Sequence, residues 1–421
     1  MTQITDDCFA FGGPLMPVDE ARQQIDQVTP SVVTPVMVSL DQVLGRVLAA
    51  DIVAQVSSPP RDNAAVDGYA FAGSPDVKAA GARLTVVGQA AAGHGLTTEI
   101  AAGEAARIFT GAPMPAGTDT VVMQEDVTLS DDGAVVAIPA GLSPGANCRK
   151  AGEDFAAGQV LRNAGQVVSP ADVALMAAGG ATAVSVLRAL KIAILSTGDE
   201  IRPAGSALQP GQIYDANRPL IAALAKAAGA EIVDHGIVPD TLEATKHALA
   251  AAAEDADLVI TSGGVSTGDA DHVKPAVEAL GALHLWRIAV KPGRPLAFGH
   301  VGGTAFVGLP GNPVASMVCF LMLVRPLIAR LGGAPSWRPR PVRVQLDFDH
   351  KSKPDRREWL RGSIAPAPDG RGMIARKYPR QGSGIIHSIA DSDGLIEIPD
   401  QCTRLSAGDF VDFLPFQECF S

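Results

Sequence analysis

From Lys191 onward, short apolar runs alternate with helical segments, and this alternation constrains the fold more than any other feature. Apolar runs typical of strands lie at 191–195, 231–238 and 257–262, and helical segments lie between them at 219–230 and 241–255. Consecutive strands joined by helices can pair in parallel, and the helices then cover both faces of the sheet. This region therefore predicts a parallel-rich sheet in a three-layer α/β domain, continued by helices over 272–281 and 313–331.

Shorter β-like runs, separated by Gly, Pro and Asp-Gly turns, lie on both sides of this region. At 421 residues the chain is long enough for about three domains. We predict a multi-domain α/β protein of four parts. These are a discontinuous helical arm at 1–54 and 149–188, an inserted β module at 55–148, the α/β domain at 189–334 and a C-terminal β module at 338–421. In the arm, apolar spacing predicts helices over 18–28, 39–53 and 169–180.

Charge and cysteine usage restrict the function. The 34 basic and 45 acidic residues give a net charge of −11, which disfavours general binding to nucleic acid or anionic membranes. Five scattered cysteines form no C-x-x-C pair and suggest a reducing compartment. The N-terminus is acidic where a signal peptide would be basic, and the apolar stretch Val314 to Val324 is too short to cross a bilayer. We expect a cytoplasmic protein without membrane attachment.

The turns that follow two of the predicted strands share a tetrapeptide. Ser196-Thr197-Gly198-Asp199-Glu200 follows the first strand, and Ser262 to Asp271, with Gly263 and Gly264, follows the third. Ligands of parallel sheets bind at the carboxyl ends of the strands. Hydroxyls, glycine N–H groups and carboxylates at that edge suit an anion held through Mg²⁺. Either turn alone would more often be an ordinary glycine turn, but the recurrence of Ser-Thr-Gly-Asp favours a site.

Two proline-containing loops add features suited to an anion. Lys291-Pro-Gly-Arg294-Pro directs two cations from a stiff loop, although such a turn is about as often merely solvated. Gly311 and Asn312 precede a helix that begins at Pro313, so Asn312 is the expected N-cap and Gly311 allows close approach to the helix N-terminus. A basic cluster near 338–361 attracts anions locally, but runs of this kind are usually solvated faces.

Several enzyme classes lack their sequence signatures here. The chain has no G-x-x-x-x-G-K-[ST] loop, no G-x-G-x-x-G after the first strand and no H-E-x-x-H, and its eight histidines are isolated. Walker-type ATPases and dinucleotide dehydrogenases are therefore disfavoured. In the inserted β module, Asp67-Gly68 and Thr110-Gly111 are, taken alone, most often hairpin turns.

Taken together, the motifs resemble a known family. They are D-G-Y-A at 67–70, T-G-A-P-M-P at 110–115, S-T-G-D-E at 196–200, S-G-G-V-S-T-G-D-A-D at 262–271, K-P-G-R-P at 291–295 and P-G-N-P at 310–313. In order and spacing they resemble the MoeA-type molybdopterin molybdenumtransferases, and the C-terminal domain of gephyrin is similar. The resemblance covers nearly the whole chain and implies the same four-part subunit.

The resemblance also implies a reaction. Molybdate would be ligated to the dithiolene of adenylylated molybdopterin, with Mg²⁺-dependent hydrolysis of the adenylate, giving AMP and molybdenum cofactor. The residues read on their own agree with this, because oxyanions need cations, Mg²⁺ needs carboxylates and close approach needs glycine turns.

Matched one position at a time, the resemblance implies roles for individual residues. The family's functional positions fall on Asp67, Thr110, Glu200, Asp240, Asp271 and Lys291. Glu200 and Asp271 are assigned to Mg²⁺ or the phosphoanhydride, Lys291 and Arg294 to the charge of molybdate and phosphate, and Asp67 and Thr110 to the molybdenum-bearing end. The expected anion-binding set is Ser196, Gly198, Ser262, Gly263, Gly264, Arg294, Gly311, Asn312, Arg357, Arg361 and Ser383.

The resemblance further implies a homodimer whose cleft combines the β module of one subunit with the α/β and C-terminal modules of the other. The molybdopterin adenylyltransferase is a possible partner. Two other functions stay open at this point. The α/β domain alone resembles an adenylyltransferase, which the additional modules argue against. A gephyrin-like scaffold would have no physical need for the charged residues that are present.

Overall fold

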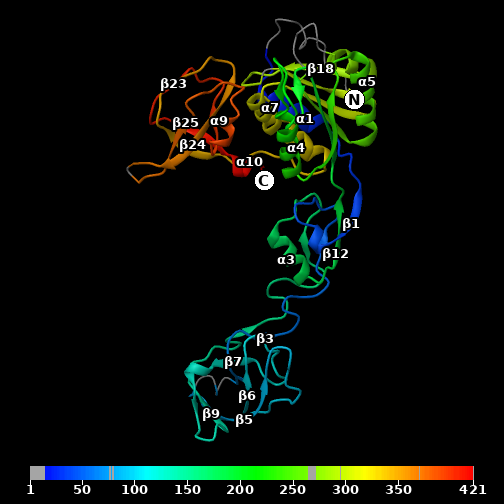
Figure 1. Cartoon of the computed structure of the whole chain (residues 1–421). Helices are drawn as coiled ribbons and strands as arrows, with labels where there is room; N and C mark the ends of the chain where they lie inside the picture. The colour runs from blue at the N-terminus through cyan, green and yellow to red at the C-terminus, as the bar shows by residue number, and fades with distance from the viewer. Residues whose placement is uncertain are drawn as a thin grey trace. The chain divides into compact units, whose positions relative to one another are not determined.

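The computed structural model describes residues 15–74, 77, 80–263, 272–293, 295–368 and 370–420. The chain divides into two units, each described here by itself. Unit 1 contains the residues up to Val36, Gly45–Val47 and the chain from Leu187 onward, and unit 2 contains Met37–Leu44 and Leu48–Val186. Figure 1 colours the chain from blue at its N-terminus to red at its C-terminus.

The α/β domain of unit 1 has a six-stranded sheet in the order β16-β13-β17-β21-β20-β18. The pairs among β16, β13, β17 and β21 are parallel, and β20 and β18 add an antiparallel edge. The strands are β13 (Lys191–Thr197), β16 (Glu231–Val238), β17 (Leu258–Ser262), β18 (Gly281–Arg287), β20 (Pro295–Val301) and β21 (Thr304–Leu309), and a parallel ribbon of β14 (Ile201–Arg202) and β15 (Ile213–Tyr214) follows β13. The expected parallel-rich α/β sheet is confirmed.

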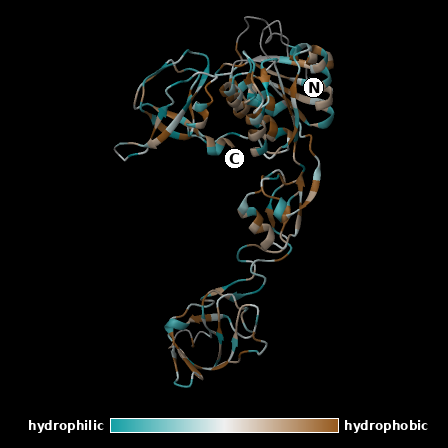
Figure 2. Ribbon diagram, viewed as in Figure 1, coloured by the Kyte–Doolittle hydropathy of each residue, from teal (hydrophilic) through white to brown (hydrophobic). Residues whose placement is uncertain are grey.

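Helices cover both faces of this sheet (Figure 1). Along β13 the buried side chains alternate, so that Ile192 and Ile194 belong to one core and Ala193 and Leu195 to the other. The first core is completed by α1 (Val18–Val28), α4 (Asn217–Ala227), α7 (Pro313–Cys319) and α8 (Arg325–Leu331), and the second by α5 (Leu242–Asp255) and α6 (Val273–Leu280). In Figure 2 these helices carry both hydrophobic and hydrophilic colours, as expected for helices that cover a sheet.

The helix from Pro313 to Leu331 is longer than the apolar stretch read from the sequence. It joins α7, a π-helical segment at Phe320–Val324 and α8 into 19 residues with a mean hydropathy of 1.9, so length and composition alone would allow it to span a bilayer. The helix was expected over 313–331, and the apolar stretch Val314 to Val324 forms only part of it. The helix is instead core, because 89% of it is buried inside the protein.

The C-terminal module of unit 1 is a closed β-barrel. Its strands pair in the order β24-β25-β22-β28-β26, and β26 returns to pair with β24. The elements are β22 (Val342–Leu346), β23 (His350–Lys351), β24 (Arg357–Pro366), β25 (Met373–Lys377), α9 (His387–Ala390), β26 (Gly394–Ile398), β27 (Arg404–Leu405), β28 (Phe410–Pro415) and α10 (Phe416–Phe420). A short strand of the chain before the barrel, β19 (Val290–Lys291), pairs in parallel with the start of β24.

The part of unit 2 that corresponds to the expected arm has its own apolar core, drawn from two separate stretches of sequence. Val43, Leu48 and Ile52 pack with Phe155, Leu161 and Met176. Its elements are the 3-10 helix Leu40–Gln42, β2 (Ile52–Val53), β11 (Val160–Arg162) and α3 (Pro170–Ala178), with β1 (Pro35–Ser39) and β12 (Ala183–Leu187) at the unit boundary.

Two expectations for the arm differ from the structure. The helix expected over 39–53 is wrong, because that stretch holds only a three-residue 3-10 helix and a short strand, with Gly45 at φ 75° between them. The helix expected over 18–28 exists as α1 but packs in unit 1, where Val18, Ala21 and Ile25 are buried in the core of the α/β domain.

The β module of unit 2 has a six-stranded sheet in the order β7-β4-β6-β5-β9-β8, with only β5 and β6 parallel. The strands are β4 (Gly68–Phe71), β5 (Ala82–Ala90), β6 (Glu104–Ile108), β7 (Thr120–Met123), β8 (Thr128–Leu129) and β9 (Val135–Ile138), with a two-stranded ribbon of β3 (Asn63–Ala64) and β10 (Cys148–Arg149). Gly68 is obligatory, because a Cβ there would lie 1.8 Å from the carbonyl oxygen of Val122.

Candidate functional site

Three neighbouring parallel strands of the α/β domain end together. Ser196 of β13 lies opposite Ser262 of β17, and Ser262 lies opposite Leu309 of β21. The N–H of Gly263 donates to the carbonyl of Leu309 at 3.1 Å, and a Cβ on Gly263 would lie 3.4 Å from the carbonyl oxygen of Thr197. The predicted residues Ser196, Ser262 and Gly263 therefore meet at the carboxyl edge of the sheet, where ligands of such folds bind.

Buried polar atoms at this edge lack partners among the described residues. The Ser196 hydroxyl is buried without a hydrogen-bond partner, as is the side-chain oxygen of Asn217 at the start of α4. Asn217 uses its other end to donate to the carbonyl of Gly311 at 2.7 Å. Leaving such atoms unpaired costs free energy, so they are suited to be satisfied by a bound ligand.

The turn after β13 brings the Glu200 carboxylate back over Gly198. Gly198 has φ 136°, a backbone conformation that favours glycine, and a Cβ there would lie 2.6 Å from Oε2 of Glu200. Asp240, which follows β16, donates its backbone N–H to Oδ1 of Asp199 at 3.4 Å. The structure thus places Glu200 and Asp240 in adjacent turns of the same domain.

These carboxylates fit Mg²⁺ in part. Among the described residues, no three His, Cys, Asp or Glu side chains converge into a metal cage. Mg²⁺ that acts on phosphates typically takes only one or two protein carboxylates and completes its shell with water and phosphate oxygens. The exposed carboxylate of Glu200 suits that role, and Asp271, its predicted partner, lies outside the described residues.

The loop before α7 meets a loop of the C-terminal barrel. Asn312 is the N-cap of α7 as expected, with Pro313 in the first turn, but its side chain makes no capping hydrogen bond. The N–H of Val314 donates to the carbonyl of Ser383 at 3.0 Å. Ser383, Gly311 and Asn312 are therefore brought together at the start of this helix, where Pro313 has no N–H and the N–H of Val314 is used by Ser383.

Arg361 is placed differently from the prediction. It is 1% exposed, and it donates to the Ser388 hydroxyl at 3.0 Å and to the carbonyl of Gly382 at 3.1 Å. Burial lowers the pKa of Arg361 to about 10, which leaves it charged at neutral pH. These contacts make Arg361 a support of the loop that carries Ser383, and direct anion binding by Arg361 stays a prediction.

Arg357 is also fully engaged. It forms ion pairs with Asp19 at 2.8 Å, Asp400 at 2.7 Å and Glu397 at 3.8 Å. Burial opposes its charge, but the hydrogen bonds to Asp19 and Asp400 outweigh this and raise the pKa of Arg357. With three carboxylates around it, Arg357 ties α1 to the barrel, and direct anion binding by Arg357 stays a prediction.

Lys291 lies where the α/β domain joins the barrel. In register, Lys291 of β19 lies opposite Glu358 of β24, and its Nζ is 3.3 Å from Oε2 of that glutamate. The Lys291 side chain is 46% exposed whereas that of Glu358 is 0% exposed. Sequence reasoning had singled out the lysine but not the glutamate.

Asp67 and Thr110 form a local pair in unit 2. Oδ1 of Asp67 accepts hydrogen bonds from both the backbone N–H of Thr110 at 2.8 Å and its hydroxyl at 2.7 Å. The backbone bond first and the hydroxyl bond second hold the pKa of Asp67 below the ordinary value of 3.8. The carboxylate is therefore ionised, with Oδ2 unpartnered by any described residue and available to a ligand.

Three predicted residues cannot be placed. Gly264, Asp271 and Arg294 lie outside the described residues. Their roles stay predictions.

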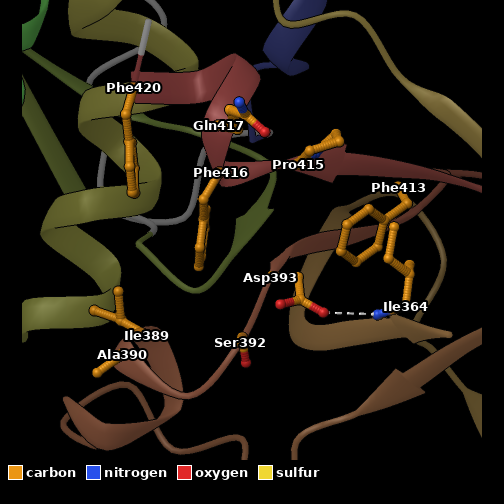
Figure 3. A pocket seen from close by; sticks show the side chains of 10 residues that line it. All are labelled: Ile364, Ile389, Ala390, Ser392, Asp393, Phe413, Pro415, Phe416, Gln417 and Phe420. Carbon is orange, nitrogen blue, oxygen red and sulfur yellow. Dashed lines mark hydrogen bonds between the residues drawn. The ribbon is translucent and has the colours of Figure 1, made fainter.

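A hollow between the barrel and its C-terminal helix differs in chemistry from the predicted site (Figure 3). Its lining residues come from β24, α9, the loop after α9, β28 and α10, and they include the aromatic rings of Phe413, Phe416 and Phe420. Asp393, its one carboxylate, accepts from the N–H of Ile364 at 3.0 Å. The lining contains no cation, so this hollow does not suit phosphate or molybdate.

Two supporting residues were missed by the sequence analysis. Gln381 exchanges hydrogen bonds with the backbone of Arg361 and thereby holds the loop before Ser383. Glu358 contacts the basic side chains of Lys291, His350 and Arg356. The sequence signal that could have found Glu358 is the alternation of side chains along a strand. It places Arg357, Trp359 and Arg361 on one face of β24, and Glu358 and Leu360 on the opposite face.

Comparison with known proteins gives the class to which this fold and site belong. Residues 193–330 match the family described as "Probable molybdopterin binding domain". Residues 16–180 match the MoeA N-terminal region (domain I and II), and residues 343–416 match the MoeA C-terminal region (domain IV). The class is thus a multi-domain protein built around a molybdopterin-binding type of α/β domain.

Full-length relatives narrow the class to one family. A molybdopterin molybdenumtransferase of Haemophilus influenzae is 37% identical over 405 residues, covering 96% of this chain and 99% of the relative. One from Nostoc is 37% identical over 86% of this chain and 85% of the relative. A solved MoeA structure from Pyrococcus horikoshii is 33% identical with a TM-score of 0.78, covering 96% of this chain and 99% of that one. The chain belongs to the MoeA family of molybdopterin molybdenumtransferases.

Proposed function

We propose that this chain is a molybdopterin molybdenumtransferase that ligates molybdate to the dithiolene of adenylylated molybdopterin, with hydrolysis of the adenylate to release AMP. The observation that carries the proposal is the meeting of Ser196, Ser262 and Gly263 at one sheet edge, with a helix N-terminus and Ser383 at the start of α7. A pterin with a phosphoanhydride needs such hydroxyls and N–H groups.

Each residue has a role in the proposed mechanism. The sheet-edge hydroxyls and glycine N–H groups bind the pterin and phosphate oxygens. Lys291, together with Arg294, balances the charge of molybdate and phosphate. Asp67, fixed by Thr110, orients the molybdenum-bearing end through its unpartnered Oδ2. Glu200, Asp240 and Asp271 complete the predicted catalytic set.

Magnesium is the proposed cofactor. Glu200 and Asp271 would hold Mg²⁺, which would supply charge neutralisation at the phosphoanhydride. The contribution of the chain itself is the turn in which the Glu200 carboxylate lies over Gly198, whose φ of 136° favours glycine.

The residues predicted for the site lie in both units. Asp67 and Thr110 belong to unit 2, whereas Glu200, Asp240 and Lys291 belong to unit 1. We propose a homodimer in which the cleft combines unit 2 of one subunit with unit 1 of the other, located in the cytoplasm and supplied by a molybdopterin adenylyltransferase. Sedimentation of the purified protein at several concentrations tests the dimer, and a monomer that is fully active would contradict it.

The experiment that tests the reaction is AMP release from adenylylated molybdopterin by the purified protein, with and without molybdate and Mg²⁺. Release that requires both supports the proposed reaction. Tight binding without release would instead favour a carrier or scaffold, and formation of adenylylated molybdopterin from ATP would favour an adenylyltransferase.

A further inference from the structure

Glu358 lies where the short strand β19, which connects β18 and β20 of the α/β domain, pairs with β24 of the barrel. The N–H of Arg357 donates to the carbonyl of Ala289 at 2.9 Å, and Lys291 lies in register with Glu358. The backbone pairing therefore fixes the Lys291 Cα beside the Glu358 Cα. Only the Lys291 side chain, which has four rotatable bonds, is left to be oriented.

Glu358 is surrounded by three basic groups. Besides Lys291 Nζ at 3.3 and 3.5 Å from its two oxygens, it contacts the Arg356 guanidinium and Nε2 of His350 at 3.2 Å. The side chains of Arg356 and His350 are each 13% exposed. The three groups come from β19, from β23 and from the residue just before β24, so two chain segments of the barrel and one of the α/β domain meet at this carboxylate.

Lys291 differs from the other two basic groups at Glu358, which are Arg356 and His350. Both Lys291 and Arg356 contribute positive charge that keeps the buried carboxylate of Glu358 ionised. Lys291 differs from Arg356 and His350 in exposure, because its side chain is 46% exposed whereas theirs are each 13% exposed. The lysine side chain is therefore partly exposed to solvent while its Nζ contacts the buried Glu358 carboxylate.

We propose that Glu358 is a positioning residue that holds the Nζ of Lys291 toward the oxyanion of the substrate. A residue of the C-terminal barrel would then orient a cation that belongs to the α/β domain. This inference rests on the proposed function, in which Lys291 binds molybdate. Nζ has three N–H groups. Two can be directed to the Glu358 oxygens, and the third is then fixed in direction and available to the anion.

Burial opposes ionisation of Glu358, but the charge of Lys291 and the hydrogen bond and charge of Arg356 outweigh it and keep the pKa of Glu358 below its ordinary value of 4.5. The carboxylate is therefore ionised at neutral pH and can act as an acceptor. Glu358→Gln keeps the shape and removes the charge, whereas Glu358→Asp keeps the charge and draws it away from Nζ by one methylene.

The test is a double-mutant cycle of Lys291→Ala and Glu358→Gln, read out by the KM for molybdate in AMP release and by the affinity for adenylylated molybdopterin. We expect Glu358→Gln to raise the KM for molybdate about tenfold while the affinity for the adenylate stays within about twofold. In the Lys291→Ala background the same change should add nothing, because Glu358 acts only through Lys291. Glu358→Asp should give an intermediate KM.

Two results would overturn the inference. One is that Glu358→Gln weakens molybdate binding and adenylate binding equally. The other is that Glu358→Gln raises the KM for molybdate by the same factor in the wild-type and Lys291→Ala backgrounds. Either result indicates a purely structural role. Asp412→Asn, which removes an exposed carboxylate of the same barrel, is the matched control and should leave both constants unchanged. Near-UV circular dichroism shows whether each variant is folded, and Glu358→Asp provides a second variant if Glu358→Gln is not.

Failure of the proposed function gives a different result. In that case the wild type releases no molybdate-dependent AMP, and equilibrium dialysis of molybdate alone replaces the KM. About tenfold weaker molybdate binding in Glu358→Gln, absent in the Lys291→Ala background, would still support the positioning role. Equal molybdate binding by wild type and Glu358→Gln would overturn it.

Discussion

The pair Asp67–Thr110 and the pair Lys291–Glu358 each contain an ionised carboxylate, but the carboxylates are stabilised by different means. In the first, a partly exposed carboxylate is held by one neighbouring residue, through its N–H and its hydroxyl. In the second, a fully buried carboxylate contacts three basic groups, and one of these is the partly exposed Lys291.

The difference determines what each pair contributes. Charges near solvent are screened and contribute little to folding, so the Asp67 pair is free to serve ligand binding. A buried charge that loses its partners is strongly destabilising, so the Glu358 cluster contributes to both folding and function. The four predictions below test this contrast, from the largest expected effect to the smallest.

Asp67→Asn should lower turnover by at least about 100-fold while the thermal midpoint stays unchanged, because the amide keeps the shape and the acceptor but loses the charge. AMP release and a thermal melt measure the two effects. Asp62→Asn is the matched control, since Asp62 lies in the same loop but is paired with Lys150. Turnover like the wild type in Asp67→Asn would contradict its role.

Glu358→Ala should destabilise unit 1 by about 3 kcal/mol, because it leaves buried cations without a counter-ion. Urea denaturation followed by near-UV circular dichroism measures this. The pKa of Glu358 lies below 4.5, so its stabilising contribution is present above that pH and is lost as the pH falls through the lowered pKa. The difference between wild type and variant should therefore shrink in acid, and a constant difference would contradict the charge argument.

Thr110→Ala should raise the pKa of Asp67 toward 3.8, because it removes the hydroxyl hydrogen bond and leaves the stronger backbone one. The acid limb of the activity profile should shift to higher pH as a result. A carboxyl titration by NMR of wild type and Thr110→Ala measures the pKa directly. Thr110→Ser retains a hydroxyl and should behave like the wild type, and an unchanged pKa in Thr110→Ala would show that the backbone bond suffices.

Asp412→Asn should cost less than about 1 kcal/mol, because its partner Arg343 is 62% exposed and exposed ion pairs contribute little. The same urea experiment measures it. A loss comparable to that of Glu358→Ala would remove the distinction between exposed and buried charge in this barrel.

The sequence by itself determined the architecture and the family. The alternation of runs after Lys191 predicted the α/β sheet, because a parallel sheet covered on both faces imposes that pattern on any chain that forms it. The motifs from Asp67 to Asn312 predicted the candidate site residues, since glycine turns and charged loops have recognisable local sequences. The helix expected over 39–53 was wrong because local spacing does not record the pairing of that segment with residues about 110 positions later.

Only the tertiary structure decided which charges are free. Arg357, Arg361 and Lys291 are equivalent as cations in the sequence, yet the fold surrounds the first with carboxylates, buries the second beneath the Ser383 loop and leaves the third exposed beside Glu358. The physical reason is that the net charge available to a ligand depends on partners distant in sequence and on burial. Both are set by strand register and packing, which no local motif encodes.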